Sequence, residues 1–290
     1  MRSGFVPVVG RPNVGKSTLI NALVGTKVSI TSERPQTTRN IIRGVVHRPD
    51  LQIVLVDTPG VHRPRTALGE RLNNRVTESL AEADAAIFMI DATAPIGPGD
   101  RLIAGRLIES ETITVCVVNK VDIAAPDEVT LQLAEAAEWD FAAYVPSSAV
   151  EGQNLAPILA EIGEVLPEGP PYFPEEMTSD QTEVFVIGEI IREKFLAKLR
   201  EELPHSLAVM VDDVTVGEDG ITRIHARLLV ERDSQKGIVI GRGGSVLEAA
   251  GTAARVELEA LLGTKVYLEL RVKVEKDWQQ RPGVIERLGM

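Results

Sequence analysis

The sequence predicts two successive domains: an α/β domain with a mostly parallel sheet and helices on both faces, and then a smaller α+β domain. Three observations predict this. A Gly-rich loop lies between an apolar run and a helical pattern, strand and helix patterns alternate up to residue 166, and beyond residue 180 the elements follow the order α-β-β-α-α-β. A chain of 290 residues is long enough for two hydrophobic cores.

The composition is that of a globular protein without a membrane span. Apolar residues make up 44% of the chain, and no apolar run reaches 18 residues. The net charge of −11 argues against a general nucleic-acid binder, but residues 183–290 carry 16 basic and 18 acidic side chains, which leaves −9 for residues 1–182. We therefore expect any contact with a phosphate backbone in the second domain. The single Cys116 lies in an apolar run, so we expect a buried thiol and a cytoplasmic protein.

The loop Gly10–Ser17 has the pattern Gly-x-x-x-x-Gly-Lys-Ser and follows the apolar run Phe5–Val9. Its glycines allow consecutive backbone N–H groups to point inward, and the start of the next helix adds a positive dipole end, so the loop suits a polyphosphate. We expect Lys16 to contact the β- and γ-phosphates and the Ser17 hydroxyl to bind Mg²⁺. This motif predicts a P-loop nucleotide-binding domain.

Two later segments are predicted to complete the phosphate end of the site. Residues 26–40 are polar and irregular, and Thr37 and Thr38 are both candidates for a second Mg²⁺ ligand on a switch segment, with Thr38 preferred. A predicted strand ends in the segment Asp57-Thr-Pro-Gly60. A carboxylate at the carboxyl end of a parallel strand suits a Mg²⁺-water ligand, and Gly60 allows its N–H to reach the γ-phosphate.

A further strand ends in Asn119-Lys-Val-Asp122, which discriminates between bases. A carboxylate at Asp122 accepts two hydrogen bonds from guanine N1–H and its exocyclic amino group, whereas adenine offers no such donor pair. The last predicted strand of the domain leads to Ser147-Ser-Ala149, whose backbone is placed to reach guanine O6. These motifs predict a GTP site.

The remaining elements are read from periodicity and turn signals. In the first domain we expect strands at 41–47, 51–56, 85–90, 112–118 and 141–146, and helices at 68–82, 101–109, 131–139 and 155–166. In the second we expect a helix capped by Ser179 or Asp180, a hairpin of strands at 207–216 and 221–232, a helix at 245–262 and a strand at 265–274. The predicted boundaries are residues 1–167, a Pro-rich linker at 168–181, a second domain at 182–276 and a tail at 277–290.

A Gly-x-x-Gly loop, Gly241–Gly244, lies between the last two predicted helices of the second domain. Gly-x-x-Gly pairs occur by chance in a chain this rich in glycine, but an apolar run precedes this one, Arg242 lies inside it and the element order around it is that of a type II KH domain. KH domains clamp single-stranded RNA at this loop. The residues expected to bind RNA are Lys236, Gly237, Ile240, Gly241, Arg242, Gly243 and Gly244.

On these motifs, together with Thr37-Thr38-Arg39, Glu189–Lys194, Lys273 and Trp278, the whole chain resembles the Era family of bacterial GTPases, of the TrmE-Era-EngA-like class of translation-factor-related GTPases. The resemblance implies GTP hydrolysis, binding of the 3′ end of small-subunit (16S) rRNA during 30S ribosomal subunit assembly, and peripheral association with the inner face of the cell membrane. Arg271 departs from the family pattern, which favours Trp or an apolar residue there.

The predicted nucleotide site joins these motifs. The residues expected to bind GTP are Gly10, Arg11, Pro12, Asn13, Val14, Gly15, Lys16, Ser17, Thr18, Asp57, Thr58, Pro59, Gly60, Val61, Asn119, Lys120, Asp122, Ser148 and Ala149. The expected Mg²⁺ ligands are Ser17, Thr38 and Asp57. The residues expected to act in catalysis are Asn13, Lys16, Thr38 and Gly60.

The predicted catalytic machinery is sparse. Val61 stands where a water-orienting Gln is often found, so we expect slow intrinsic hydrolysis, and the neighbouring His62 is more readily explained as an exposed loop residue. In some related GTPases an Asn at the position of Asn13 binds K⁺, which supplies positive charge to the transition state. K⁺ is therefore a second candidate cation beside Mg²⁺.

A rival reading is a signalling or membrane-associated GTP switch whose C-terminal domain docks a protein partner. That reading predicts an exposed amphipathic helix with a basic face, and the sequence shows none as clear as the KH pattern. A tRNA-modification GTPase and a factor with two GTPase domains do not fit, because the chain lacks a C-terminal Cys and has one Gly-x-x-x-x-Gly-Lys-Ser motif.

Overall fold

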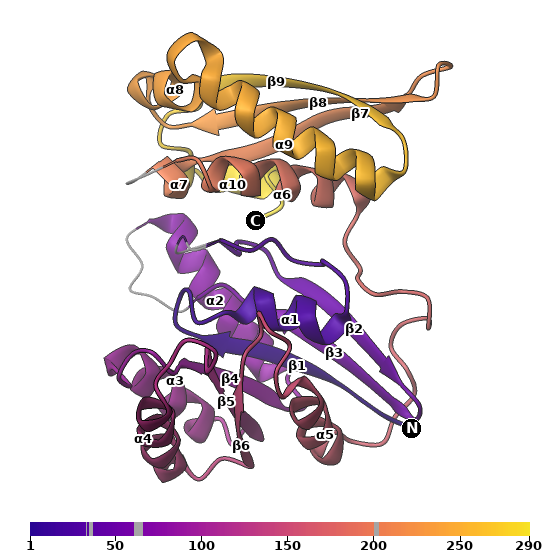
Figure 1. Cartoon of the computed structure of the whole chain (residues 1–290). Helices are drawn as coiled ribbons and strands as arrows, with labels where there is room; N and C mark the ends of the chain where they lie inside the picture. Colours follow the sequence, from indigo (N-terminus) through magenta and orange to yellow (C-terminus); the bar gives the residue numbers. More distant parts are fainter. Residues whose placement is uncertain (33, 35–36, 61–65, 200–202) are drawn as a thin grey trace. The chain divides into compact units, whose positions relative to one another are not determined.

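The computed structural model describes residues 1–290 except 33, 35–36, 61–65 and 200–202. The chain forms two compact units, one of residues 1–65 with 69–180 and one of residues 66–68 with 181–290 (Figure 1).

In the first unit, six strands form one sheet in the order β2-β3-β1-β4-β5-β6. β2 is antiparallel to β3, and all other neighbours are parallel. The strands are β1 (Arg2–Gly10), β2 (Ile42–Arg48), β3 (Leu51–Asp57), β4 (Ala86–Asp91), β5 (Thr114–Asn119) and β6 (Ala143–Ser147). The predicted mostly parallel sheet is confirmed.

Helices cover both faces of this sheet, and each face has its own core (Figure 1). Leu19 of α1 and Ile158 of α5 belong to one core, whereas Ile103 of α3 and Ala136 of α4 belong to the other. The helices are α1 (Lys16–Val24), α2 (Ala67–Ala81), α3 (Pro98–Glu109), α4 (Pro126–Ala136) with the 3₁₀ turn η1 (Ala137–Trp139), and α5 (Leu155–Val165).

α3 begins three residues before its predicted start at residue 101, and α4 begins five residues before its predicted start. The apolar pattern indicates a start near residue 131, but α4 begins at Pro126. Its first turn is polar, so apolar periodicity does not reveal it. Pro126 suits the first helical position, and the Glu128 carboxylate accepts a hydrogen bond from the backbone N–H of Ala125 at 2.8 Å.

The segment predicted as a linker is bonded to the first unit along its length. The Gln52 side chain accepts from the backbone N–H of Phe173 at 3.0 Å and donates to its carbonyl at 2.7 Å. Near the end of the segment, the backbone N–H of Val45 donates to the Thr178 carbonyl at 2.8 Å, and Arg43 pairs with Asp180 at 2.8 Å. Residues 172–180 therefore run beside β3 and β2, after residues 168–170 have bonded to the start of β1.

The second unit contains a three-stranded sheet in the order β7-β8-β9, with β7 antiparallel and β9 parallel to β8. Its elements are α6 (Glu183–Leu196), α7 (Leu203–Ser206), β7 (Ala208–Val216), β8 (Ile221–Val230), α8 (Asp233–Ile240), η2 (Arg242–Gly244), α9 (Ser245–Leu262), β9 (Lys265–Val274), η3 (Trp278–Gln280) and α10 (Pro282–Arg287). α6 and α9 pack on one face of the sheet and enclose the core (Figure 1). The predicted order α-β-β-α-α-β is confirmed, with the short α7 added after α6.

Both ends of this unit differ from the sequence-based expectation. The N-cap of α6 is Thr182, whose hydroxyl accepts from the backbone N–H of Phe185 at 3.3 Å, and not Ser179 or Asp180. At the other end, Trp278 is fully buried and its indole N–H donates to the Ser206 carbonyl at 2.8 Å. The segment predicted as a tail is therefore part of the packed unit.

Candidate functional site

The carboxyl ends of neighbouring parallel strands bring the predicted nucleotide-binding residues to one edge of the first sheet. The register pairs Val8 of β1 with Asp57 at the end of β3. It pairs Asp91 at the end of β4 with Asn119 at the end of β5, and Asn119 with Ser147 of β6. Ligands of open α/β sheets bind at this edge.

The phosphate-binding loop connects β1 to α1 and depends on its glycines. A Cβ on Gly10 would lie 2.6 Å from the Met89 carbonyl oxygen, and Gly15 has φ +103° with a Cβ position 2.4 Å from Asn119 Nδ2. Asn13 adopts the left-handed conformation at φ +66°, which Asn tolerates better than most residues. The spacing of the motif is thus a requirement of backbone packing.

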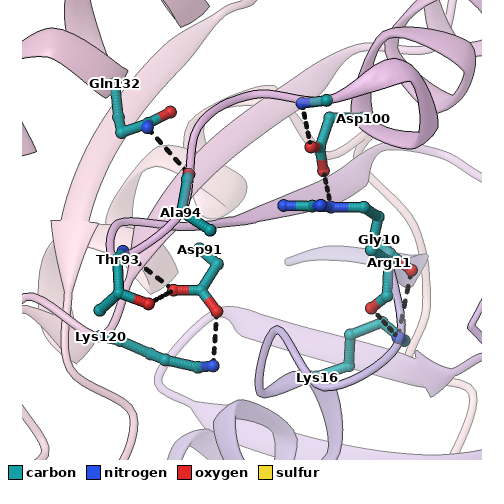
Figure 2. A network of polar contacts seen from close by, with 10 residues as sticks. Gly10, Arg11, Lys16, Asp91, Thr93, Ala94, Asp100, Lys120 and Gln132 are labelled. Atoms are coloured by element: carbon teal, nitrogen blue, oxygen red, sulfur yellow. Dashed lines mark hydrogen bonds and ion pairs between the residues drawn. The ribbon is translucent and has the colours of Figure 1, made fainter. Parts of the chain in front are cut away.

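Lys16 is buried in this loop, with 7% of its surface exposed. Its ammonium donates to the carbonyls of Gly10 at 3.2 Å and Arg11 at 3.0 Å (Figure 2). Burial lowers the pKa of Lys16 to about 8, although the charge of Asp57 acts in the opposite direction. Because a buried ammonium is costly, an anionic group in the loop would stabilise its charged form.

The three predicted Mg²⁺ ligands meet beside Lys16. Asp57 Oδ2 accepts from Ser17 Oγ at 2.7 Å and from Thr38 Oγ1 at 3.2 Å, and the two hydroxyls are 3.1 Å apart. Thr37 instead donates to the Arg34 carbonyl at 2.6 Å. The structure thus brings Thr38 to the other two predicted Mg²⁺ ligands.

The Asp57 carboxylate has the properties of a cation site. It is fully buried, and its Oδ1 has no hydrogen-bond partner among the described residues. Burial raises the pKa of Asp57, whereas hydrogen bonds from Ser29 and Ser17 and the charge of Lys16 lower it. A carboxylate and two hydroxyl groups are hard oxygen donors, so the residues present fit Mg²⁺.

The segment after Asp57 packs directly on the phosphate loop. Thr58 Oγ1 donates to the Val8 carbonyl at 2.7 Å, and a Cβ on Gly60 would lie 3.0 Å from the backbone nitrogen of Pro12. Gly60 is therefore required for this close approach. Val61 and His62 lie outside the described residues.

The predicted base-reading loops are tied to the phosphate loop by Asn119, which is 3% exposed. Its Nδ2 donates to the Val14 carbonyl at 2.7 Å, and its Oδ1 accepts from the backbone N–H of Ala149 at 3.0 Å. Asp122, the residue predicted to read guanine, is exposed. The Asn119 side chain thus links its own loop to the phosphate loop and to the loop of Ala149. The backbone N–H of Ala149 is therefore already hydrogen-bonded within the protein.

Sequence reasoning missed several residues around the phosphate loop. The Ser29 hydroxyl donates to Asp57 Oδ2 at 2.5 Å, and Asn21 holds Ser29 by accepting from its backbone N–H at 2.9 Å. These residues lie in or before a stretch without periodicity, so their role emerges only in three dimensions. The cleft is lined by Pro12, Asn13, Gly15, Lys16, Ser17, Thr18, Thr31, Ser32, Arg34, Thr37, Thr38 and Gly60.

The predicted RNA-binding loop follows α8 in the second unit. Gly241, Gly243 and Gly244 have φ of +78°, +62° and +84°, and a Cβ on Gly241 would lie 2.7 Å from the backbone nitrogen of Val246. Arg242 is exposed. Gly237 lies inside α8 with nothing within 4 Å of its Cβ position, so no steric requirement explains it.

A groove of about 370 Å³ continues from this loop between α9 and β9. The KH pattern predicts RNA binding at the adjacent loop but does not identify the residues of the groove. They are Gly243, Gly244, Leu247, Glu248, Gly251, Thr252, Arg255, Leu268 and Leu270. The apolar floor of Leu268 and Leu270 with polar groups on the α9 side suits unpaired bases.

Within the described part of the chain, no helix has the length and apolarity needed to cross a membrane.

Comparisons with known proteins match both units. The family of 50S ribosome-binding GTPases matches residues 5–120, and the KH domain family matches residues 202–279. The chain is 54% identical to the GTPase Era of Mycobacterium avium (strain 104) and 52% identical to that of Mycobacterium tuberculosis (strain ATCC 25177 / H37Ra), with 99% of this chain and 98% of each relative covered.

Two solved structures are similar over the full length. One is a variant of Aquifex aeolicus Era bound to GDP·AlF4⁻, with a TM-score of 0.95, and the other is Era in complex with MgGDPNP and nucleotides 1506–1542 of 16S ribosomal RNA, with a TM-score of 0.96. Each is 40% identical to this chain and covers 100% of it and 99% of the solved chain. From the two units and these full-length relatives, the chain belongs to the Era family, GTP hydrolases with an N-terminal GTPase domain and a C-terminal KH domain.

Proposed function

We propose that the sheet edge of the first unit binds GTP with Mg²⁺ through the residues that the motifs identify. The observation that carries this assignment is the meeting of Ser17, Thr38 and Asp57 within 3.2 Å of one another beside the buried Lys16. Ser17, Thr38 and Asp57 would hold the cation. When bound, Mg²⁺ supplies positive charge to the β- and γ-phosphates. The solved relative with MgGDPNP supports this proposal.

Other groups of the protein bind the phosphates and the base. Backbone N–H groups of residues 10–18 cradle the phosphates, Lys16 neutralises developing charge, and the Gly60 N–H donates to the γ-phosphate. Asp122 accepts from the guanine N1–H and amino group. Asn119 and Lys120 hold the base loop, residues 119–122, in place. Val61, with its apolar side chain, orients no water, so intrinsic hydrolysis is slow.

K⁺ is proposed as a second cation at Asn13. Asn13 lines the phosphate cleft and is exposed, and its left-handed backbone turns the chain at that point. An amide oxygen is a hard ligand suited to a monovalent cation, and a K⁺ ion there would add positive charge beside the transferred phosphoryl group.

The second unit is proposed to bind the 3′ end of 16S rRNA, with the backbone clamped at Gly241–Gly244 and bases in the α9–β9 groove. The glycine geometry, the exposed Arg242 and the groove support this proposal, as does the solved relative in complex with nucleotides 1506–1542 of 16S rRNA. The whole chain then acts as a GTP-dependent switch in assembly of the 30S subunit.

The experiment is binding of a labelled RNA with the sequence of nucleotides 1506–1542, against a scrambled RNA, with a GTP analogue and with GDP. We expect sequence-selective binding that is tighter with the GTP analogue. Arg242→Glu should weaken it without changing GTP affinity, whereas Arg106→Glu, the same charge change on an exposed residue of α3, should not. Absent or unselective RNA binding would overturn the proposal and favour a switch that docks a protein partner.

A cytoplasmic location with peripheral attachment to the inner face of the cell membrane is also proposed, on the family resemblance. Co-sedimentation with vesicles of mixed zwitterionic and anionic lipids tests the attachment, and protein left entirely in the supernatant contradicts it.

A further inference from the structure

The connection between β4 and α3, residues 91–100, contacts both halves of the nucleotide site (Figure 2). It begins at the carboxyl end of β4, beside the end of β5, and runs into the first turn of α3. None of its residues belongs to a nucleotide-binding motif. Its two carboxylates, Asp91 and Asp100, are bonded to residues that do.

Asp100 holds the phosphate loop from the side. Its carboxylate is 0% exposed, accepts from Arg11 Nε at 2.8 Å and accepts from the backbone N–H of Gly97 at 2.9 Å (Figure 2). The Arg11 side chain lies over the first turn of α3, where a Cβ on Gly99 would come within 3.1 Å of Arg11 Cδ. A fully buried carboxylate needs such a partner, so the Arg11 contact is enforced by burial.

Arg11 transmits this contact to the phosphate-binding groups. Its carbonyl accepts from the Lys16 ammonium at 3.0 Å, and the adjacent Gly10 carbonyl accepts from the same group at 3.2 Å (Figure 2). The side chain of Arg11 is thus fixed by α3 while its backbone faces Lys16. A shift of Arg11 would move the acceptors that orient Lys16.

Asp91 holds the base loop at the other end of the connection. It pairs with Lys120 Nζ at 2.5 Å and accepts from Thr93 Oγ1 at 2.6 Å (Figure 2). Burial acts to raise the pKa of Asp91, but the bonds from Lys120 and Thr93 outweigh it and the pKa is lowered, so the carboxylate is charged at neutral pH. Backbone bonding adds to the contact, since the N–H of Ala92 donates to the Asn119 carbonyl at 2.8 Å.

The middle of the connection is anchored to α4. The Gln132 side chain is buried, and its Nε2 donates to the Ala94 carbonyl at 2.8 Å (Figure 2). The connection is therefore held at both ends and in the middle by bonds to three other elements.

We propose that residues 91–100 form a positioning element that sets the distance between the phosphate loop and the base loop, with Asp100 acting through Arg11 and Asp91 acting through Lys120. A nucleotide must satisfy both loops at once, so a change in their separation weakens the whole ligand and loosens base selection. This inference rests on the proposed nucleotide site at the sheet edge.

The test is a double-mutant cycle on Arg11 and Asp100, with GTP and GDP affinities measured by titration of a fluorescent analogue. Asp100→Asn keeps an acceptor for the Gly97 N–H but removes the charge, and Arg11→Lys keeps the charge but not the Nε donor. We expect each to weaken both nucleotides about tenfold, and the double variant to be little worse than either one. Additive effects, or unchanged affinities, would overturn the proposal for Asp100.

A second measurement tests Asp91, which contacts the base loop. Asp91→Asn is expected to lower the ratio of GTP to ITP affinity by about fivefold, because Lys120 and its loop lose their charged partner. A purely structural role would weaken both nucleotides alike and leave the ratio unchanged, which would overturn the proposal for Asp91. All variants are compared well below their melting temperatures, measured by circular dichroism.

Two control variants distinguish a failure of the positioning element from a failure of the proposed nucleotide site. Arg101→Gln breaks an exposed ion pair with Glu135 that joins α3 to α4 one residue beyond Asp100, and should leave nucleotide binding unchanged. An effect equal to that of Asp100→Asn would show a general response of α3 and overturn the proposal. Lys16→Ala tests the site itself: if it still binds nucleotide, the proposed site is wrong, whereas lost binding with unaltered Asp91 and Asp100 variants rejects the positioning element alone.

Discussion

In the proposed nucleotide site, the side chains around the phosphate loop are buried and hydrogen-bonded within the protein, whereas in the proposed RNA groove several polar side chains are exposed. Lys16, Asp57 and Asn119 are all buried and hydrogen-bonded within the protein. Arg242 and Glu248 are exposed. The proposed nucleotide site is thus organised by buried hydrogen bonds, and the proposed RNA groove by its glycine backbone and an apolar floor.

This difference in construction predicts a difference in response to mutation. Removing one member of a buried polar network leaves its partners unsatisfied, so effects on nucleotide binding should be large and specific. Removing one exposed polar group from the groove leaves its shape intact, and only changes to the glycine backbone should have comparable effects there.

The largest effect is expected for Lys16→Ala. The buried ammonium is the charged donor of the phosphate loop, and charge-assisted hydrogen bonds contribute roughly 1.5–3 kcal/mol each, so loss of contacts to two phosphates should weaken GTP and GDP binding by at least about 100-fold. RNA binding without nucleotide should be retained. Isothermal titration measures the nucleotide affinity, with Lys276→Ala on the exposed surface of the second unit as the control. Unchanged nucleotide affinity would show that the buried Lys16 does not contact the phosphates, and would contradict the contrast between the buried nucleotide site and the exposed RNA groove.

Asp122→Asn should have the next largest effect, on selectivity. An amide in place of the carboxylate cannot accept both guanine donors, so GTP affinity should fall by about 100-fold and preference should move toward a base with the complementary pattern, such as xanthine. Competition of GTP, XTP and ATP against a labelled nucleotide measures this shift. If GTP affinity and selectivity are both retained, Asp122 does not read the base.

Gly241→Ala tests the backbone of the RNA loop. Its φ of +78° and the 2.7 Å approach of its Cβ position to the Val246 nitrogen require a rearrangement that costs about 1–3 kcal/mol. We expect RNA affinity to fall by about tenfold while GTP affinity stays the same. Gly283→Ala, in α10 of the same unit with nothing within 4 Å, is the matched control and should leave RNA binding unchanged. Equal RNA binding by the two variants would mean that the loop is not shaped by Gly241.

The same contrast explains what could be predicted from the sequence. Lys16, Asp57 and Asn119 were predictable because their chemistry is tied to fixed spacing at strand ends, and the strands themselves have clear apolar runs. Ser29 and Asp100 were not, because their partners lie far along the chain: Arg11 and Asp100 are 89 residues apart in sequence. Asp91 had a usable signal, since it ends a buried strand as Asp57 does.

The location of the RNA-binding loop in the second unit was predictable from the sequence, but the residues that line the adjacent groove were not. The Gly-x-x-Gly pattern locates the loop, because positive φ at Gly241, Gly243 and Gly244 requires residues of this kind. Thr252 and Arg255 carry no such signal, because polar residues outside the core are common on helices. Their position beside Leu270 depends on how α9 packs on β9.

The smallest expected effect concerns Asn13, which is exposed although its neighbour Lys16 in the phosphate loop is buried. If Asn13 binds K⁺, GTP turnover should be roughly fivefold faster in KCl than in NaCl, equivalent to ~1 kcal/mol of transition-state stabilisation. The difference should vanish in Asn13→Ala and also in Asn13→Gly, which suits φ +66° without an amide oxygen, so backbone strain does not account for the loss. Phosphate release at saturating GTP measures turnover, and GTP affinity in both salts shows whether the effect lies in the chemical step. Equal rates in the two salts would mean that K⁺ bound at Asn13 contributes nothing to the chemical step.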